Sequence, residues 1–265
     1  MLIIAERINA SRKMIGQAIE AGDRAFIQAE AVSQAKAGAH YLDVNAGTFV
    51  GAEKEKLQWV IEAVQEVTEL PLCIDSPDHE VIRAMMPLLK KTPIINSINL
   101  EPVRFAGILP LVLEHKSKMI ALCQAEGVMD ETTTETKVGL AGRLVEKLTV
   151  AGVPLDDIYI DPLVYPLSTN PLSAMATLNA IEEIMKRFPG VHSVCGLTNV
   201  SYGLPARKAL NRAFFAAAIL KGIDAAIIDP TDKLLFTTMK AMAVVAGKDN
   251  SCMDYIGAFR EGRLE

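Results

Sequence analysis

The sequence predicts one α/β domain over residues 1–265, a (β/α)8 TIM barrel. The main observation is a unit that recurs eight times: a short apolar run, a polar tip and a stretch with helical periodicity. No Gly-, Ser- or Pro-rich linker divides the chain, which favours a single domain. A doubly wound sheet is the structural alternative, but it does not need eight nearly equal units. The GxGxxG motif typical of that fold is also missing after the first apolar run.

Each of the eight apolar runs is short and rich in Ile, Val, Leu or Ala, as buried parallel strands are. The expected strands are Leu2–Ala5, Tyr41–Val44, Leu72–Ile74, Ile94–Ile95, Lys118–Cys123, Ile158–Ile160, Ser193–Leu197 and Ala225–Ile228. The clearest helical periodicity lies in Lys54–Thr68, His79–Lys90, Pro102–His115, Thr133–Ala151, Pro171–Phe188, Pro205–Lys221 and Thr231–Ala246.

Helix boundary signals agree with this division of the chain. Three prolines lie near first helical positions, namely Pro102, Pro171 and Pro205. Three glycines follow helices and precede strands, namely Gly38, Gly152 and Gly222. The tail Cys252–Glu265 is expected to form a short helix or an irregular arm.

Composition excludes several classes of function. The chain has 265 residues, 50% of them hydrophobic, and a net charge of −5 with no basic stripe, so nucleic acid is not an expected partner. No apolar segment approaches the ~20 residues of a membrane helix, and the first apolar run is too short for a signal peptide. We therefore expect no membrane partner and a cytoplasmic location.

Metal binding by cysteine or histidine is not expected. The four cysteines form no CxxC pair, and three of them, Cys73, Cys123 and Cys195, lie in apolar runs typical of buried small residues. The four histidines show no ligand spacing.

In a TIM barrel the chemistry gathers at the carboxyl ends of the strands. The tips there carry Glu6, Arg7, Asn9, Asp43, Asn45, Asp75, Ser76, Asn96, Ser97, Asn99, Gln124, Asp161, Thr198, Asn199 and Asp229. Four Asp could ligate a divalent cation, but the His or modified Lys of catalytic metal barrels is missing, so no metal is predicted. A Schiff-base mechanism is not indicated either, because no Lys is near a strand end.

Acids and amides together are suited to a flat, nitrogen-rich ring. A carboxylate accepts two N–H groups from an amidine-like edge such as that of a pterin, and an Asn pairs with a neighbouring donor and acceptor. A nucleobase is matched equally well by these groups. Asp75, Asn96 and Asp161 each end an apolar run and are expected to converge on one barrel mouth. Ser76 and Asp229 read more simply as cap or turn residues.

Six ordered motifs carry a resemblance to a known family. They are ERIN (6–9), LDVNAG (42–47), LCIDS (72–76), IINSIN (94–99), YIDPLV (159–164) and GLTNVSYGLPAR (196–207). The set resembles the pterin-binding methyltransferases, above all the methyltetrahydrofolate:corrinoid methyltransferases of acetogenic and bacterial demethylation systems. It is also similar to the folate domain of cobalamin-dependent methionine synthase. The resemblance runs from Leu2 to about Asp254.

The resemblance implies a barrel, usually a homodimer, that holds tetrahydrofolate or 5-methyltetrahydrofolate as substrate at its mouth. It implies that Asp75, Asn96 and Asp161 bind the pterin, together with Gly196 and Asn199, and that Asn199 is a mobile residue near N5. Further contacts are implied for the substrate loop residues Arg207 and Tyr202, although a compared relative has Gln at the latter position. Additional candidates are Glu6, Asn9, Asp43, Asn45 and Gln124.

The corrinoid (cobalamin) is expected to arrive on a partner corrinoid protein. No DxHxxG corrinoid motif and no cysteine-rich zinc site occur, so homocysteine is not an expected substrate. The loops Gln124–Thr134, an exposed lid, and Tyr165–Pro171 are the expected docking rim. Within the first of these, Asp130 and Glu131 are the charges whose exchange is expected to weaken docking.

Two alternatives stay open. Dihydropteroate synthases share this barrel but place cations after strands seven and eight, where this chain has Thr198-Asn199-Val200 and Asp229-Pro230-Thr231. A folate-binding module without turnover is the second alternative. For methyl transfer, we expect an SN2 step in which Asn199 hydrogen-bonds N5 while water, Asp75 and Asp161 carry the proton. Gly203 and Pro205 suggest a hinge that lets Asn199 and Tyr202 shift.

Overall fold

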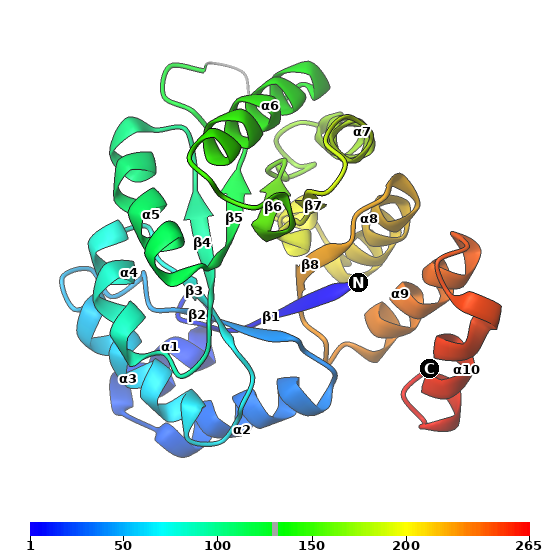
Figure 1. Ribbon diagram of the computed structural model, residues 1–265. Helices are drawn as coiled ribbons and strands as arrows, with labels where there is room; N and C mark the ends of the chain where they lie inside the picture. The colour runs from blue at the N-terminus through cyan, green and yellow to red at the C-terminus, as the bar shows by residue number, and fades with distance from the viewer. Residues whose placement is uncertain (129–131) are drawn as a thin grey trace.

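The computed structural model describes residues 1–128 and 132–265, and in these ranges eight parallel strands form a barrel surrounded by helices (Figure 1). This confirms the predicted fold class. The strands are β1 (Leu2–Asn9), β2 (Tyr41–Asn45), β3 (Leu72–Asp75), β4 (Ile94–Ile98), β5 (Lys118–Leu122), β6 (Ile158–Asp161), β7 (His192–Ser193) and β8 (Ala225–Ile228). Neighbours in the sheet follow the order β7-β6-β5-β4-β3-β2-β1-β8.

Helices connect the strands along the outside of the barrel. They are α1 (Lys13–Ala21), α2 (Arg24–Lys36), α3 (Glu53–Gln65), α4 (His79–Met85), α5 (Pro102–His115), α6 (Thr134–Val150), α7 (Ser173–Arg187), α8 (Arg207–Lys221), α9 (Lys233–Val245) and α10 (Met253–Arg260). For the tail Cys252–Glu265 a short helix or an irregular arm was expected, and the structure has the short helix α10, which packs beside α9. None of the described helices is long and apolar enough to cross a membrane.

Two helices, α1 and α2, were not among those predicted from periodicity. The buried positions of α2 are Ile27, Ala31 and Gln34, so its inner face contains a small residue and a polar one. Such a face gives little apolar contrast in the sequence. Of the three prolines, Pro102 is at the start of α5, whereas Pro171 and Pro205 precede α7 and α8 by two residues.

The seventh strand is shorter than predicted. The run Ser193–Leu197 was expected to be a strand, but β7 ends at Ser193, and Leu197–Ser201 forms a 3-10 helix, η3. The barrel is closed across this seam by a single bridge between Gly196 and Ile227 and by the bond from Ile227 N to Cys195 O, 3.1 Å. The run is apolar because it is buried on both sides, and burial alone does not require extended backbone.

Alternation along the strands explains why polar groups collect at the mouth. One buried cluster joins Ile4, Cys73, Ile94, Ile120, Tyr159, Val194 and Ala225 from strands on opposite sides of the barrel, so these side chains fill its interior. Side chains two residues further along a strand point the same way. In four strands those next inward positions are Glu6, Asp75, Asn96 and Asp161. Cys73, Cys123 and Cys195 are buried, as predicted.

Candidate functional site

Asp75 and Asn45 meet side by side at the mouth. They are paired in the register of β2 and β3, and Asn45 Nδ2 donates to Asp75 Oδ2 at 2.9 Å. The other end of the amide, Oδ1, accepts from Gly47 N at 3.0 Å and so orders the loop after β2. Burial raises the pKa of Asp75 to about 6, against the opposing effects of the Asn45 bond and of Arg104.

Asp43 lies one layer below the mouth, beside Cys73 in the register. Its side chain is hydrogen-bonded with Cys73 and Asn96, and the residue is only 3% exposed. Burial, reinforced by the nearby Asp75, raises the pKa of Asp43 well above its usual range. Within the described residues its Oδ1 has no hydrogen-bond partner. Asp43 thus supports Asp75 and Asn96 from below and is not on the rim.

Asp161 ends β6 on the other side of the barrel. Its Oδ1 accepts from Leu163 N at 2.7 Å, and the backbone of Gly196 supplies a further hydrogen bond. Burial raises the pKa of Asp161 to about 6 even though these bonds favour the carboxylate. Asp161 and Gly196, both proposed from the sequence, are therefore direct neighbours.

Asn199 belongs to η3 and not to a strand end, which corrects the sequence-based placement. Its side chain is exposed, and its backbone N–H donates to Gly196 O at 3.3 Å. A Cβ on Gly196 would lie 3.3 Å from Asn199 Nδ2, so the glycine leaves room for the carboxamide. The carboxamide therefore lies close to Gly196, the neighbour of Asp161.

Arg207 and Tyr202 fix the loop around η3. Arg207 donates through Nη2 to Thr198 O at 2.8 Å and through Nε to Ser201 Oγ at 3.0 Å. Tyr202 is 67% exposed, its ring lies under the Arg207 guanidinium, and its carbonyl accepts from Ser168 Oγ at 2.7 Å. In this structure both residues organise the loop, and the Tyr202 ring is available at the surface.

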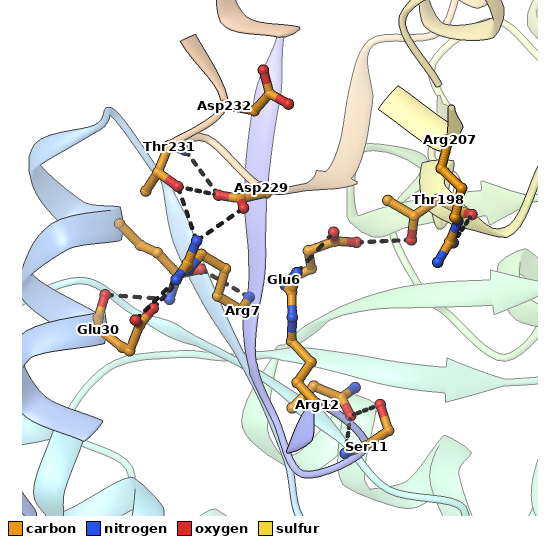
Figure 2. A network of polar contacts seen from close by, with 12 residues as sticks. Glu6, Arg7, Ser11, Arg12, Glu30, Thr198, Arg207, Asp229, Thr231 and Asp232 are labelled. Atoms are coloured by element: carbon orange, nitrogen blue, oxygen red, sulfur yellow. Dashed lines mark hydrogen bonds and ion pairs between the residues drawn. The ribbon is translucent and has the colours of Figure 1, made fainter. Parts of the chain in front are cut away.

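Glu6 faces η3, whereas its neighbour Arg7 turns the other way (Figure 2). Glu6 Oε2 accepts from Thr198 Oγ1 at 3.4 Å, and burial raises the pKa of Glu6 to about 7. Arg7 is held by Glu30 at 2.6 Å and by Asp229 at 3.2 Å, which ties β1 to α2 and to the end of β8. The Asp229 carboxylate also accepts from Thr231 N at 2.9 Å, the turn role predicted for it.

Asn9 and Gln124 make hydrogen bonds within the loops that follow their strands or to an adjacent loop. Asn9 Oδ1 accepts from Ser11 N at 3.0 Å and from Ser11 Oγ at 2.7 Å. Gln124 Oε1 accepts from Asn99 Nδ2 at 3.2 Å, which joins the loops after β4 and β5. Asn9 and Gln124 therefore order the loops at the rim of the mouth, whereas Asp75 and Asp161 lie at inward positions of their strands.

Two cations behind the mouth were missed by the sequence reasoning. Arg104 on α5 donates to three backbone carbonyls, those of Ser97 (2.7 Å), Pro77 (2.8 Å) and Ser76 (2.9 Å). Lys137 on α6 donates to the carbonyls of Pro162 and Leu163. A signal existed for Lys137, because it lies in register with the buried stripe Ala141, Leu144 and Leu148.

The mouth can therefore bind a nitrogen-rich ring through acids of raised pKa and amides, with cations held behind them. Among the described residues no group of three or more His, Cys, Asp or Glu is placed to hold a metal ion. The loop charges Asp130 and Glu131 lie outside the described residues.

The chain is similar to known proteins over most of its length. Residues 5–229 match the family described as pterin binding enzyme. The chain is 39% identical over 267 residues to the methylcorrinoid:tetrahydrofolate methyltransferase of Eubacterium limosum, a match that covers 100% of this chain and 98% of that protein. It is 33% identical over 242 residues to the methionine synthase of Mycobacterium leprae, where the match covers 86% of this chain and only 20% of that protein.

A solved structure shows the same fold. Dihydropteroate synthase from Xanthomonas albilineans, in complex with 7,8-dihydropteroate, superposes with a TM-score of 0.71 over 93% of each chain. At 21% identity this likeness concerns the fold alone. The family match, in contrast, runs from within β1 to the residue after β8 and includes all the strand ends of the mouth. Because the family match covers residues 5–229, the chain belongs to the pterin binding enzymes.

Proposed function

We propose that this chain transfers a methyl group between N5 of tetrahydrofolate and the cobalt of a corrinoid carried by a partner protein. The observation that carries the proposal is the set Asp75, Asn96 and Asp161, which occupy the next inward positions of β3, β4 and β6 after the buried interior layer, at one mouth. The methylcorrinoid:tetrahydrofolate methyltransferase that matches the whole chain supports this substrate pair.

The mouth provides acceptors for a pterin. Asp75 and Asp161 have pKa values raised to about 6, so both are mostly carboxylates at neutral pH and accept N–H groups. Asn96 provides one donor and one acceptor edge between them. Folate affinity is therefore expected to fall as the pH drops through about 6, where the two acids become protonated.

The transfer is an SN2 displacement. Toward folate, the N5–carbon bond forms while the cobalt–carbon bond breaks, the electron pair stays on cobalt, and the N5 proton leaves. In reverse, a proton must return to N5 because a tertiary amine leaves poorly as an anion. We assign the bond to N5 to Asn199, and the proton path to water beside Asp75 and Asp161. A bond that strengthens in the transition state accelerates the step.

The decisive variant is Asn199→Ala, measured under anaerobic conditions with free methylcobalamin and tetrahydrofolate. We expect kcat/KM to fall by about 10²–10³, the usual effect of losing one such hydrogen bond. Asn250→Ala removes an exposed amide from the C-terminal 3-10 helix and is the matched control. If Asn199→Ala keeps both its kcat/KM and its folate Kd, the role assigned to Asn199 is wrong.

Exposed apolar side chains around the mouth support docking of a large partner. Each lies between a strand end and the first turn of the helix that follows, which places it on the same face as the site. They are Met14, Val50, Val103, Leu172, Met175 and Tyr202. Val50 is the most exposed of the six, at 94%, and several exposed apolar side chains gathered on one face are typical of an interaction surface.

Docking is tested with Val50→Asp combined with Val103→Asp. We expect weaker transfer with the corrinoid protein and unchanged transfer with free cobalamin. Val150→Asp is the control, because Val150 is 85% exposed at the opposite end of α6, on the far face of the barrel. Equal losses with both methyl sources contradict a docking role.

The two cations nearest η3 and β8 argue against a diphosphate-displacing activity. Arg207 is engaged with Thr198 and Ser201, and Arg7 with Glu30 and Asp229. A folate-binding module without turnover is separated from an enzyme by the methylcobalamin assay itself, since it would bind folate but transfer nothing.

We also expect a homodimer and a place in a demethylation system, as the resemblance implies. A dimer predicts a mass twice that of one chain by light scattering. The demethylation role predicts that a corrinoid protein loaded by a separate methyltransferase acts as donor. A carrier protein that cannot donate its methyl group to tetrahydrofolate through this chain contradicts that role.

A further inference from the structure

A fully buried lysine lies behind the carboxylate that ends β6. Lys137 is in the first turn and a half of α6, its exposed fraction is 0%, and it is the largest of the fully buried side chains. Removing an ammonium group from water is costly unless charge-assisted hydrogen bonds and nearby negative charge compensate for it. A lysine in this position therefore points to a specific task for its charge.

The ammonium group binds the turn that follows Asp161. Lys137 Nζ donates to Pro162 O and to Leu163 O, each at 2.6 Å, and lies 5.1 Å from the ring centre of Tyr165. Leu163 has φ 58°, a left-handed conformation uncommon for a branched residue. Its N–H donates to Asp161 Oδ1 at 2.7 Å. Lys137 thus binds the carbonyl oxygens of this turn, and an N–H group of the same turn binds the Asp161 carboxylate.

The same cation acts on the charge of Asp161. Burial raises the pKa of Asp161 to about 6, and the Leu163 N–H, the positive charge of Lys137 and the Gly196 backbone all oppose that rise. From the segment after β7, the thiol of Cys195 also faces Asp161, but its own pKa is raised well above the usual range, so it stays neutral. Lys137 therefore provides the positive charge that favours the carboxylate.

We propose that Lys137 is a positioning residue for the pterin: it keeps Asp161 ionised at neutral pH, and it holds the turn after Asp161 in the conformation that orients this carboxylate. The lysine is fully buried behind the turn. It therefore acts through Asp161 and does not contact the substrate. The inference rests on the proposed function, because it takes Asp161 as an acceptor for pterin N–H groups.

The first test needs no ligand. The Asp161 side-chain carboxyl is titrated by 13C NMR in the full chain, with the signal assigned by its loss in Asp161→Asn. Lys137→Met is expected to raise the pKa of Asp161 by one unit or more. The control Lys147→Met, an exposed position on the same helix, leaves it unchanged. An unchanged Asp161 pKa in Lys137→Met overturns the inference whether or not folate binds.

The second test measures the Kd for tetrahydrofolate from pH 5 to pH 9 by anaerobic calorimetry. We expect Lys137→Met to bind roughly two- to tenfold more weakly at pH 7 and about as tightly as wild type at pH 9, where Asp161 is largely ionised in both. Equal weakening at every pH indicates a merely structural role and contradicts the inference. A wild-type chain that binds no folate at any pH contradicts the proposed function instead, and the NMR titration still decides the role of Lys137.

Two further variants distinguish the loss of the Lys137 charge from a general loss of folding. Lys137→Gln keeps a donor for the carbonyls but removes the charge, so it should raise the Asp161 pKa as Lys137→Met does. Lys137→Arg keeps the charge and should restore a value of about 6. In the Asp161→Asn background, Lys137→Gln should no longer change the pH dependence of folate binding. A pH-dependent effect that persists there overturns the coupling between the two residues.

Discussion

At the residue scale, the mouth contains three buried acids whose ionised forms lower the stability of the fold. The pKa of Glu6 is raised to about 7 and those of Asp75 and Asp161 to about 6, in each case chiefly by burial. A carboxyl group whose pKa is higher in the folded chain stabilises the fold only while it is protonated. At neutral pH the ionised forms of these three residues therefore cost stability, a trade-off that is common in functional sites.

Glu6 gives a test of this trade-off. Its stabilising contribution is full below the unfolded pKa of 4.5 and is lost as the pH rises through about 7. Glu6→Gln, which cannot ionise, should therefore be more stable than wild type at pH 8, by on the order of 2 kcal/mol. The difference should shrink toward pH 5. Urea unfolding at the two pH values measures it, with the exposed Glu20→Gln as control for the loss of one negative charge. A difference that does not vary with pH contradicts the prediction.

At the element scale, helices α5 and α6 each send one cation behind a strand end. Arg104 of α5 joins β4 to the loop after β3 through three carbonyls, and Lys137 of α6 holds the loop after β6. Both cations lower the pKa of the acid in front of them, Asp75 and Asp161 respectively. The helices thus hold the strand ends that carry Asp75 and Asp161 from outside the barrel.

Arg104→Leu should loosen the connection between the strand ends that carry Asp75 and Asn96. We expect the Kd for tetrahydrofolate to rise about tenfold or more, because misplaced acceptors and a higher Asp75 pKa both weaken the pterin contacts. Arg104→Lys should recover part of the affinity, since an ammonium lacks the planar fork of donors that reaches three carbonyls. Arg83→Leu, on the exposed side of α4, is the control. Wild-type affinity in Arg104→Leu would show that the strand ends keep their places without it.

At the scale of the whole molecule, the weak point of the barrel is the seam between β7 and β8. In the described parts of the chain, strand pairing across this seam is limited to the bridge between Gly196 and Ile227. A polar cluster spans the same seam at the end of the barrel opposite the mouth. His192 of β7 bonds Asp224, just before β8, at 2.7 Å and Asp156 at 3.1 Å, and its ring stacks on Tyr159. Burial opposes protonation of His192, but the bonds to the two acids outweigh it and raise its pKa above the usual value.

This seam makes stability depend on pH. A histidine with a raised pKa stabilises the fold fully below its unfolded pKa, and the contribution is lost as the pH rises through the folded pKa. His192→Gln should therefore lower the Tm at pH 6 by roughly 2–4 °C, a modest effect because the ring is partly exposed, and by less at pH 9. Thermal unfolding followed by circular dichroism measures it, with the helix-end His115→Gln as control. A larger loss at pH 9 than at pH 6 would reverse the assigned sign.

The sequence was most informative where periodicity and register coincide. The tips of β3, β4 and β6 were predicted to converge because parallel strands in a barrel end on one face. Asp75 and Asp161 end β3 and β6 as expected, whereas β4 continues to Ile98, two residues beyond Asn96. It was least informative after Ser193, where an apolar run was interpreted as a strand and forms η3 instead. Apolar composition reports burial, and burial does not distinguish a strand from a short helix that closes a seam.

By itself, the sequence determined the eight-unit barrel and the acids and amides at the ends of its strands. Local pattern is sufficient for these features because strand alternation and chain order fix which side chains point inward. Only the tertiary structure decided that Asp43 lies below the mouth, that Asn199 extends from η3 over Gly196, and that Lys137 lies behind Asp161. These relations join residues on different elements, and their energies depend on burial and distance, which no local pattern contains.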